Sequence, residues 1–272
     1  MLTFEREAII MKIIDIHAHI YPDAIAQKAA ASVKEFYEGI GDPSMSGTES
    51  MLLEQGIKAG IDRFVVLPVA IRPDRVQSIN DFIYQRAQAN PCLIPFGTVH
   101  AAMDDLMDEV ARLVNLGVKG IKMHPDSQRF ALDDPRLFPM YEAIQGHIPV
   151  MLHMGDPRYD YSHPVRLRRL LQLFPQLDVI AAHLGGYSMP ETARQLLQDT
   201  NCVMDISSSV VFLDPGVAEN YINLYGAERI AFGSDYPMFD PLKEVNNFLR
   251  LQLTDAQKEQ IAHKTAERVL KL

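Results

Sequence analysis

The chain has 272 residues, of which 47% are hydrophobic and 22% charged, a balance typical of globular proteins and too apolar for a disordered one. Its net charge of −9 argues against nucleic acid or an anionic membrane as the main partner. The two cysteines, Cys92 and Cys202, cannot form a disulfide framework, so a reducing, cytoplasmic location is expected. No apolar run approaches the roughly 18 residues that a membrane-spanning helix needs.

Strand-like and helix-like segments alternate along the chain after its first ten residues. Residues 1–10 lack the apolar stretch of a signal peptide and are interpreted as an N-terminal extension of one domain, 11–272. Short segments rich in Ile and Val, as strands covered on both sides should be, predict eight strands at 12–17, 63–68, 93–98, 120–124, 150–153, 179–183, 202–206 and 230–234.

The segments between these strands carry helical patterns, several of which start with proline. Helices are predicted at 49–59, 74–89, 104–116, 135–145, 164–174, 190–199, 215–225 and 254–270, with Thr254 able to cap the last one. Residues 36–50, which are rich in Gly, Pro and Ser, are interpreted as a loop or insertion. Eight alternating units favour a (β/α)8 barrel. The alternative is an open doubly wound sheet, but no glycine-rich phosphate fingerprint follows the first strand.

The end of the first predicted strand carries two histidines. Because side chains alternate across a strand, Ile14 and Ile16 are expected to face the outer helices. Asp15, His17 and His19 would then face the opposite side, at the mouth of the barrel. Two imidazoles at positions i and i+2 can bind one metal ion.

Other predicted strands also end in groups that bind metals. The fifth strand ends in His153, the sixth in His183 and the eighth runs into Asp235, while the fourth carries Lys122 and His124. The active site of a barrel lies at the carboxyl ends of its strands, so these side chains are expected to meet there. Imidazoles with one carboxylate suit Zn²⁺, and also Mn²⁺ or Fe²⁺.

The segments IIDIHAHI, GIKMHP, PVMLHMG, IAAHLGG and AFGSDYP, in this order, resemble the metal-dependent amidohydrolase superfamily. Within it they are most similar to the amidohydrolase-2 branch, which resembles aminocarboxymuconate semialdehyde decarboxylase. The resemblance implies a distorted (β/α)8 barrel holding one or two divalent metals. It implies metal ligands at His17, His19, His153 and Asp235, and catalytic proton transfer by Asp235 and His183.

The resemblance also bears on the number of metals. One divalent metal is expected, with zinc as the first choice and manganese or iron as alternatives. His183, Lys122 and His124 would either support this metal from outside its ligand set or hold a second one. A carbamylated Lys122 stays open as part of a two-metal site.

Three functions are compatible with this site. The main expectation is hydrolysis of a small amide, lactone or ester-like substrate by a metal-activated water. The alternatives are non-oxidative decarboxylation of an aromatic or unsaturated carboxylic acid, and a barrel that binds metal without turnover. An acidic substrate would need a cation, for which Arg158 is the first candidate, Arg72 the second and Arg129 the third. The expected partner is a small molecule, and relatives suggest a homodimer.

Overall fold

All eight predicted strands are present in the computed structural model, which describes residues 11–272. The third is interrupted at Phe96 and forms two short strands, β3 and β4. The predicted extension, residues 1–10, lies outside the described residues. The strands are β1 (Ile14–Ala18), β2 (Arg63–Val66), β3 (Leu93–Pro95), β4 (Gly97–Thr98), β5 (Ile121–Met123), β6 (Val150–Leu152), β7 (Val179–Ala181), β8 (Val203–Asp205) and β9 (Ile230–Ala231).

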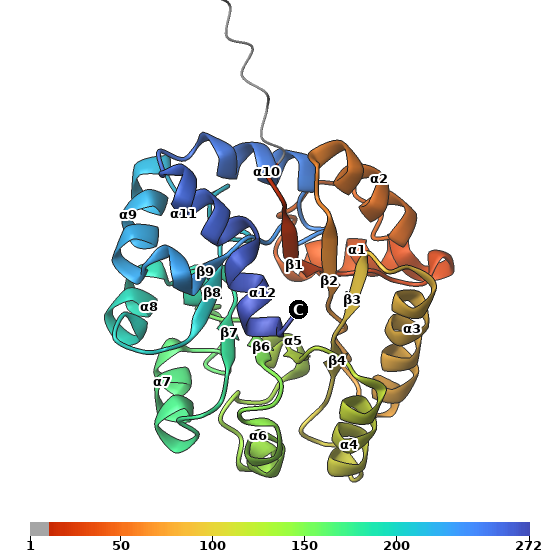
Figure 1. Ribbon diagram of the computed structural model, residues 1–272. Helices are drawn as coiled ribbons and strands as arrows, with labels where there is room; N and C mark the ends of the chain where they lie inside the picture. Colours follow the sequence, from red (N-terminus) through yellow and green to blue (C-terminus); the bar gives the residue numbers. More distant parts are fainter. Residues whose placement is uncertain (1–10) are drawn as a thin grey trace, which may run out of the picture.

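These strands close into a barrel (Figure 1). All pairs are parallel, in the orders β1-β2-β3 and β4 through β9. The last strand meets the first through backbone hydrogen bonds, from Ile16 N to Phe232 O at 3.0 Å and from His19 N to Tyr236 O at 2.7 Å. The prediction of a (β/α)8 barrel is therefore confirmed, and the open doubly wound sheet is wrong.

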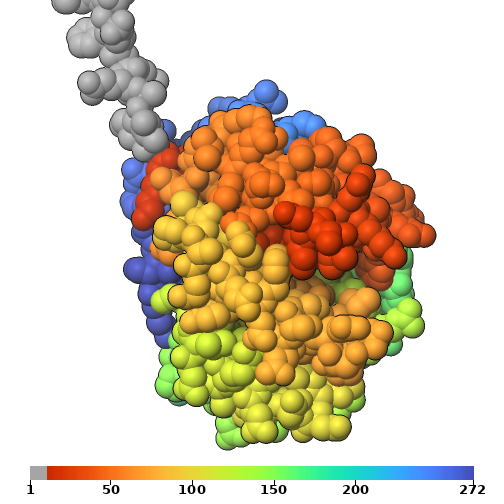
Figure 2. All heavy atoms as spheres, turned by 90° about the vertical axis from the view of Figure 1, so that its right-hand side faces the viewer, coloured from red at the N-terminus to blue at the C-terminus, as the bar shows by residue number. Residues whose placement is uncertain are grey.

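Helices surround the barrel, and most of them match the predictions (Figure 1). Helices α7 to α9 begin at their prolines, as predicted. The outer helices that match are α2 (Glu49–Ala59), α3 (Val76–Ala89), α4 (Leu106–Leu116), α6 (Phe138–Ile144), α7 (Pro164–Leu173), α8 (Pro190–Leu197) and α9 (Pro215–Tyr225). In the space-filling view of Figure 2, the first half of the chain, which includes α1 to α4, covers one side of the molecule.

The last predicted helix is built from three consecutive parts. Helix α11 (Asp255–Glu259) continues through one π-helical turn, Gln260–Lys264, into α12 (Thr265–Leu270). Thr254 caps the start as predicted: its hydroxyl accepts from Gln257 N, and the Gln257 side chain accepts from Thr254 N. Helix α12 crosses one end of the barrel in Figure 1.

Within residues 11–272, three α-helices were not predicted. They are α1 (Asp23–Phe36), α5 (Pro125–Gln128) and α10 (Pro241–Arg250). Helix α1 buries only two alanines, Ala26 and Ala30, so its apolar pattern is too weak to indicate a helix from sequence. Turns and bends over residues 37–48 separate α1 from α2. Among residues 11–272, no helix has the length and apolar character that crossing a bilayer requires.

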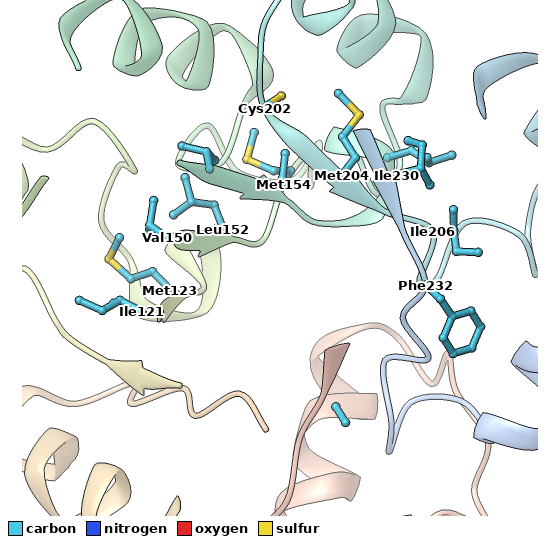
Figure 3. Close-up of a cluster of buried hydrophobic side chains, with 14 of the residues drawn as sticks. Ile121, Met123, Val150, Leu152, Met154, Cys202, Met204, Ile206, Ile230 and Phe232 are labelled. Atoms are coloured by element: carbon cyan, nitrogen blue, oxygen red, sulfur yellow. The ribbon is translucent and has the colours of Figure 1, made fainter. Parts of the chain in front are cut away.

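The apolar core has two layers on opposite faces of the strands. The outer layer joins strand residues such as Met123 and Leu152 to helix residues such as Leu170 and Ile222. Figure 3 shows the part of this layer that lies along β5 to β9. The inner layer is formed by alternate residues along the strands and by side chains of α12, which close one end of the barrel. Its members include Val65, Phe96, Met151, Ile180, Ala266 and Leu270.

The first strand departs from simple alternation. Its pairing with β2 shifts register between Asp15 and Ala18. Ile14 and Ile16 belong to the inner layer, and Ala18 belongs to the outer one. The prediction that the two isoleucines face the helices is therefore wrong. The irregularity lets Ile16 and His17, although adjacent, both contribute to the interior.

Candidate metal centre and active site

Three predicted metal ligands meet at the carboxyl end of the barrel. His17 is in β1, His19 follows it and Asp235 follows β9. The Nε2 atoms of His17 and His19 lie 3.5 and 3.8 Å from Oδ1 of Asp235. One potential ligand atom from each of these residues falls within 4.8 Å of the other two. Closure of the barrel thus brings together groups from the two ends of the domain.

The outward nitrogens of both histidines are held by acceptors. His17 Nδ1 lies 2.9 Å from Oδ2 of Asp205, and His19 Nδ1 lies 2.7 Å from the Leu67 carbonyl oxygen. Metal-binding histidines commonly donate their second N–H to such acceptors. Burial, aided by the Lys122 charge, lowers the pKa of His17 well below its usual value and that of His19 to about 3. Both rings are therefore neutral, and these residues fit a divalent cation.

Asp205, which no sequence argument selected, organises this region. The side chain is fully buried at the end of β8. Its Oδ1 accepts from the backbone N–H groups of His183 and Ser207, at 3.1 and 3.0 Å, and from the Ser207 hydroxyl at 2.5 Å. The sequence did contain one signal for Asp205: it is a single carboxylate in a short apolar strand. A charged residue in such a buried strand is expected to have hydrogen-bond or charge partners.

Asp235 is the carboxylate of the predicted ligand set. Ser208 donates a hydrogen bond to its Oδ2. Burial raises the pKa of Asp235 to about 7, while the Ser208 hydrogen bond and the Lys122 charge oppose this rise. A divalent cation at this position would favour the charged form of the carboxylate.

His153 and His183 face each other in the mouth of the barrel. His153 Nδ1 lies 3.0 Å from His183 Nε2, and His183 Nδ1 lies 3.0 Å from the Ser207 carbonyl oxygen. His153, the fourth predicted ligand, falls in a different group of potential ligands, with His124 and Asp126. The structure therefore brings three predicted ligands together and places the fourth beside His183.

Lys122 and His124 lie on either side of this arrangement. Lys122 is fully buried, and its Nζ is 3.3 Å from Nε2 of His17. Burial lowers the pKa of Lys122 to about 8, against the opposing charges of Asp205 and Asp235. The His124 ring stacks on His153 with centroids 3.9 Å apart.

The three candidate arginines are not equivalent. Nε and Nη2 of Arg158 form paired hydrogen bonds to Asp156 at 3.0 and 2.7 Å, and Arg72 pairs with Asp74 at 2.9 and 2.7 Å. The forked face that would clamp a substrate carboxylate is thus occupied in both. Arg129 is exposed, and its side chain makes no hydrogen bond or ion pair within residues 11–272.

Close backbone packing fixes the loops that follow β6 and β7. A methyl group added to Gly155, two residues after His153, would lie 2.4 Å from the Cα atom of Gly186. We expect Gly155→Ala to lower the free energy of unfolding by about 1–3 kcal/mol more than Gly146→Ala does. Both glycines have positive φ, +79° and +75°, but Gly146 has open space around it. Urea denaturation of the two variants measures the difference, and equal losses would contradict the packing argument.

The fold and the site together define a class of protein: a parallel barrel with histidines and a carboxylate arranged for a divalent metal at its mouth. The amidohydrolase-2 family model, described as Amidohydrolase, matches residues 14–272. The chain belongs to this family, as the sequence motifs predicted.

One curated relative and two solved structures are similar to this chain. The chain is 26% identical over 212 residues to 2-amino-3-carboxymuconate-6-semialdehyde decarboxylase from Dictyostelium discoideum, covering 63% of this chain and 58% of that protein's length. A TIM-barrel protein of unknown function from Bordetella bronchiseptica has a TM-score of 0.80 at 23% identity, covering 96% and 99% of the two chains. A dihydroxybenzoic acid decarboxylase from Polaromonas sp. JS666, solved with manganese and 2-nitroresorcinol, has a TM-score of 0.74 at 16% identity, covering 96% and 97%.

These comparisons correct the main functional expectation. Hydrolysis was predicted first, but the Dictyostelium relative and the Polaromonas structure are both named as decarboxylases. The ligands themselves could not separate the two reactions, because the same cation can bind a substrate for either one. A divalent metal is supported by the family and by the convergence of His17, His19 and Asp235, whereas the preference for zinc has no such support.

Proposed function

We propose that this chain is a metal-dependent, non-oxidative decarboxylase acting on an aromatic or unsaturated carboxylic acid. One observation carries the proposal: His17, His19 and Asp235 converge at the barrel mouth, in a chain that is 26% identical to a decarboxylase over 212 residues. The substrate is then a small molecule. A homodimer, a cytoplasmic location and zinc rather than manganese or iron stay predictions of the sequence.

The proposed ligand set is His17, His19, His153 and Asp235, holding one divalent cation. When bound, the cation supplies positive charge that binds and orients oxygen atoms of the substrate. The outward N–H groups of His17 and His19 donate to Asp205 and to a carbonyl oxygen, which fixes both rings.

Decarboxylation breaks the bond between the carboxylate and its carbon, leaves the electron pair on that carbon and replaces CO₂ with a proton. We assign the delivery of this proton to Asp235 and His183. Ser208 orients the Asp235 carboxyl, and the Ser207 carbonyl holds Nδ1 of His183, so that its Nε2 faces the mouth. Lys122 and His124 lie beside this machinery, and neither is needed as a metal ligand.

The reaction is tested directly by CO₂ release. Metal-loaded protein is incubated with a panel of hydroxylated benzoic acids and unsaturated di- and tricarboxylic acids. We expect at least one acid to release CO₂ in a metal-dependent way. In D₂O, the product should carry one deuterium at the carbon that lost the carboxylate, because a site acid in exchange with solvent delivers the proton.

The controls use two histidines in different places. His17→Ala should lose turnover, whereas His147→Ala should keep it, because His147 is exposed and its side chain makes no hydrogen bond to residues 11–272. Metal-loaded protein that releases CO₂ from no acid in the panel would contradict the proposal. That outcome would favour the alternative of a barrel that binds metal without turnover.

A further inference from the structure

Tyr37, the residue directly after α1, reaches into the proposed site. Its hydroxyl lies 2.6 Å from Nε2 of His124 and 3.2 Å from Nε2 of His153. The side chain is buried, with 8% of its surface exposed. No sequence pattern singled it out, because it follows a helix that the sequence did not predict. The contact joins residues that are 116 positions apart in the chain.

Tyr37 completes a pattern that the other proposed ligands share. His17 and His19 each have the nitrogen that points away from the mouth held by an oxygen atom. For His153 the nearest carboxylate oxygen, Oδ2 of Asp126, is 4.0 Å away, which is too long for a hydrogen bond. The Tyr37 hydroxyl at 3.2 Å is the oxygen atom within reach.

The position of Tyr37 is fixed by Arg158, the arginine that the sequence suggested as a carboxylate clamp. The Nη1 group of Arg158 donates to the carbonyl oxygen of Phe36 at 2.6 Å, at the end of α1. Its Nε and Nη2 groups bind Asp156, which is buried in the loop after β6. The guanidinium lies 4.9 Å from the ring centroid of Phe36 and 5.6 Å from that of Tyr37. Arg158 thus connects the end of α1 to the loop that follows His153.

We propose that Tyr37 is a positioning residue for the metal centre: its hydroxyl holds Nε2 of His153, and the Arg158–Asp156 pair holds Tyr37 in place. The inference rests on the proposed metal site and deepens it. Tyr37 accepts the Nε2 proton of His153 and donates its own to Nε2 of His124. His153 then presents an unprotonated Nδ1 to the mouth, as a metal ligand must, and this nitrogen exchanges its 3.0 Å contact with Nε2 of His183 for the metal. The exchange is required because the proton of His183 is on Nδ1, which faces the Ser207 carbonyl, so its Nε2 has no proton to donate.

This direction of donation also changes the partners of His124. His124 then carries its proton on Nδ1. This nitrogen can no longer accept the hydrogen bond from the Ser127 backbone N–H, which at 3.3 Å is the longest hydrogen bond of His124. The hydroxyl of Tyr37 can turn about its C–O bond, so it can point at either histidine. The tyrosine thereby selects which nitrogen of His153 is free.

The test measures metal affinity, independently of any substrate. Metal-free protein is titrated with Co²⁺, whose visible spectrum reports its ligands, and with Mn²⁺. We expect Tyr37→Phe to weaken binding about 10- to 100-fold, the usual effect of removing a partner of a metal ligand, and to change the Co²⁺ spectrum. Tyr159→Phe is the matched control. Its ring stacks with Phe36 in the same aromatic group, and its hydroxyl makes no hydrogen bond to the described part of the chain.

A second pair of variants tests the connection through Arg158. Arg158→Gln should weaken Co²⁺ binding up to about 10-fold, at the lower end of this range. Arg72→Gln removes a similar arginine–aspartate pair two residues apart and should leave binding unchanged.

The outcomes separate this inference from the proposed reaction. Wild-type affinity and spectrum in Tyr37→Phe would overturn the role of Tyr37, whatever the enzyme does to carboxylic acids. Loss of affinity in Tyr37→Phe, in a protein that releases no CO₂, would support the positioning role while the proposed reaction fails. A wild-type chain that binds neither ion would overturn this inference together with the metal site.

Discussion

Replacing His17 with alanine is expected to remove most of the bound metal from the purified protein. His17 contributes one of the three converging ligand atoms, and Asp205 fixes its ring. Removing a residue that hydrogen-bonds to a metal ligand commonly weakens metal binding about 10- to 100-fold. Removing the ligand itself should therefore weaken binding more than about 100-fold. Elemental analysis should find about one divalent metal per wild-type chain and little in the variant.

The same analysis on His153→Ala examines the fourth proposed ligand, which the structure places beside His183. We expect this variant to lose most of its metal as well. His147→Ala should retain a full complement, because His147 lies on the surface away from this cluster. If His17→Ala and His153→Ala both keep stoichiometric metal, the ligand assignment is wrong.

Replacing Asp205 with alanine is expected to lower the free energy of unfolding of metal-free protein by about 3–5 kcal/mol. The buried carboxylate accepts hydrogen bonds from His17, from the backbone of His183 and from both the backbone and hydroxyl of Ser207. Each buried donor left without a partner costs about 1–3 kcal/mol, and these costs are not additive. The substitution also removes a buried charge that is costly to desolvate, and this gain offsets part of the lost stability.

Two further variants separate the contributions of Asp205. Asp205→Asn keeps an oxygen for Ser207 and His183, so most of the stability should remain while metal binding weakens, because an amide cannot accept at both positions. Asp178→Ala, at an exposed aspartate just before β7, should change stability by less than about 0.5 kcal/mol. Guanidinium unfolding of metal-free samples gives all three values. Equal stability of Asp205→Ala and Asp178→Ala would refute the proposed network.

The local patterns of the sequence were sufficient for the strands and most helices. Alternating short apolar segments predicted every strand, because parallel strands buried on both faces must be apolar. Prolines placed the starts of α7, α8 and α9, because the first turn of a helix needs no N–H from proline. Weak local signals failed at α1, where only Ala26 and Ala30 are buried.

Alternation also failed within β1, and the cause is tertiary. Ile14 and Ile16 share the inner face, and regular alternation would then turn His17 to the helices; the register shift between Asp15 and Ala18 lets His17 face the interior as well. His17 still reaches the mouth, but through an irregular backbone that depends on both neighbouring strands. No pattern within the strand itself indicates such a shift.

The arginines show a similar limit of local reasoning. Arg158 and Arg72 were both selected as cations on loops near strand ends. In the fold each binds an aspartate two residues away, and only Arg158 also contacts the end of α1. The sequence showed where the arginines are. Their hydrogen-bond partners depend on the conformation of each loop, which the sequence pattern does not give.

The sequence by itself determined the parallel barrel, the family and the residues that end the strands as possible metal ligands. These depend on apolar periodicity and on residue types at strand ends, which neighbouring positions in the chain reveal. Only the tertiary structure brought Asp205 to His17 and Tyr37 to His153, across 188 and 116 positions. Closure of the barrel sets such contacts, because it fixes the distance and direction between side chains that no local pattern relates.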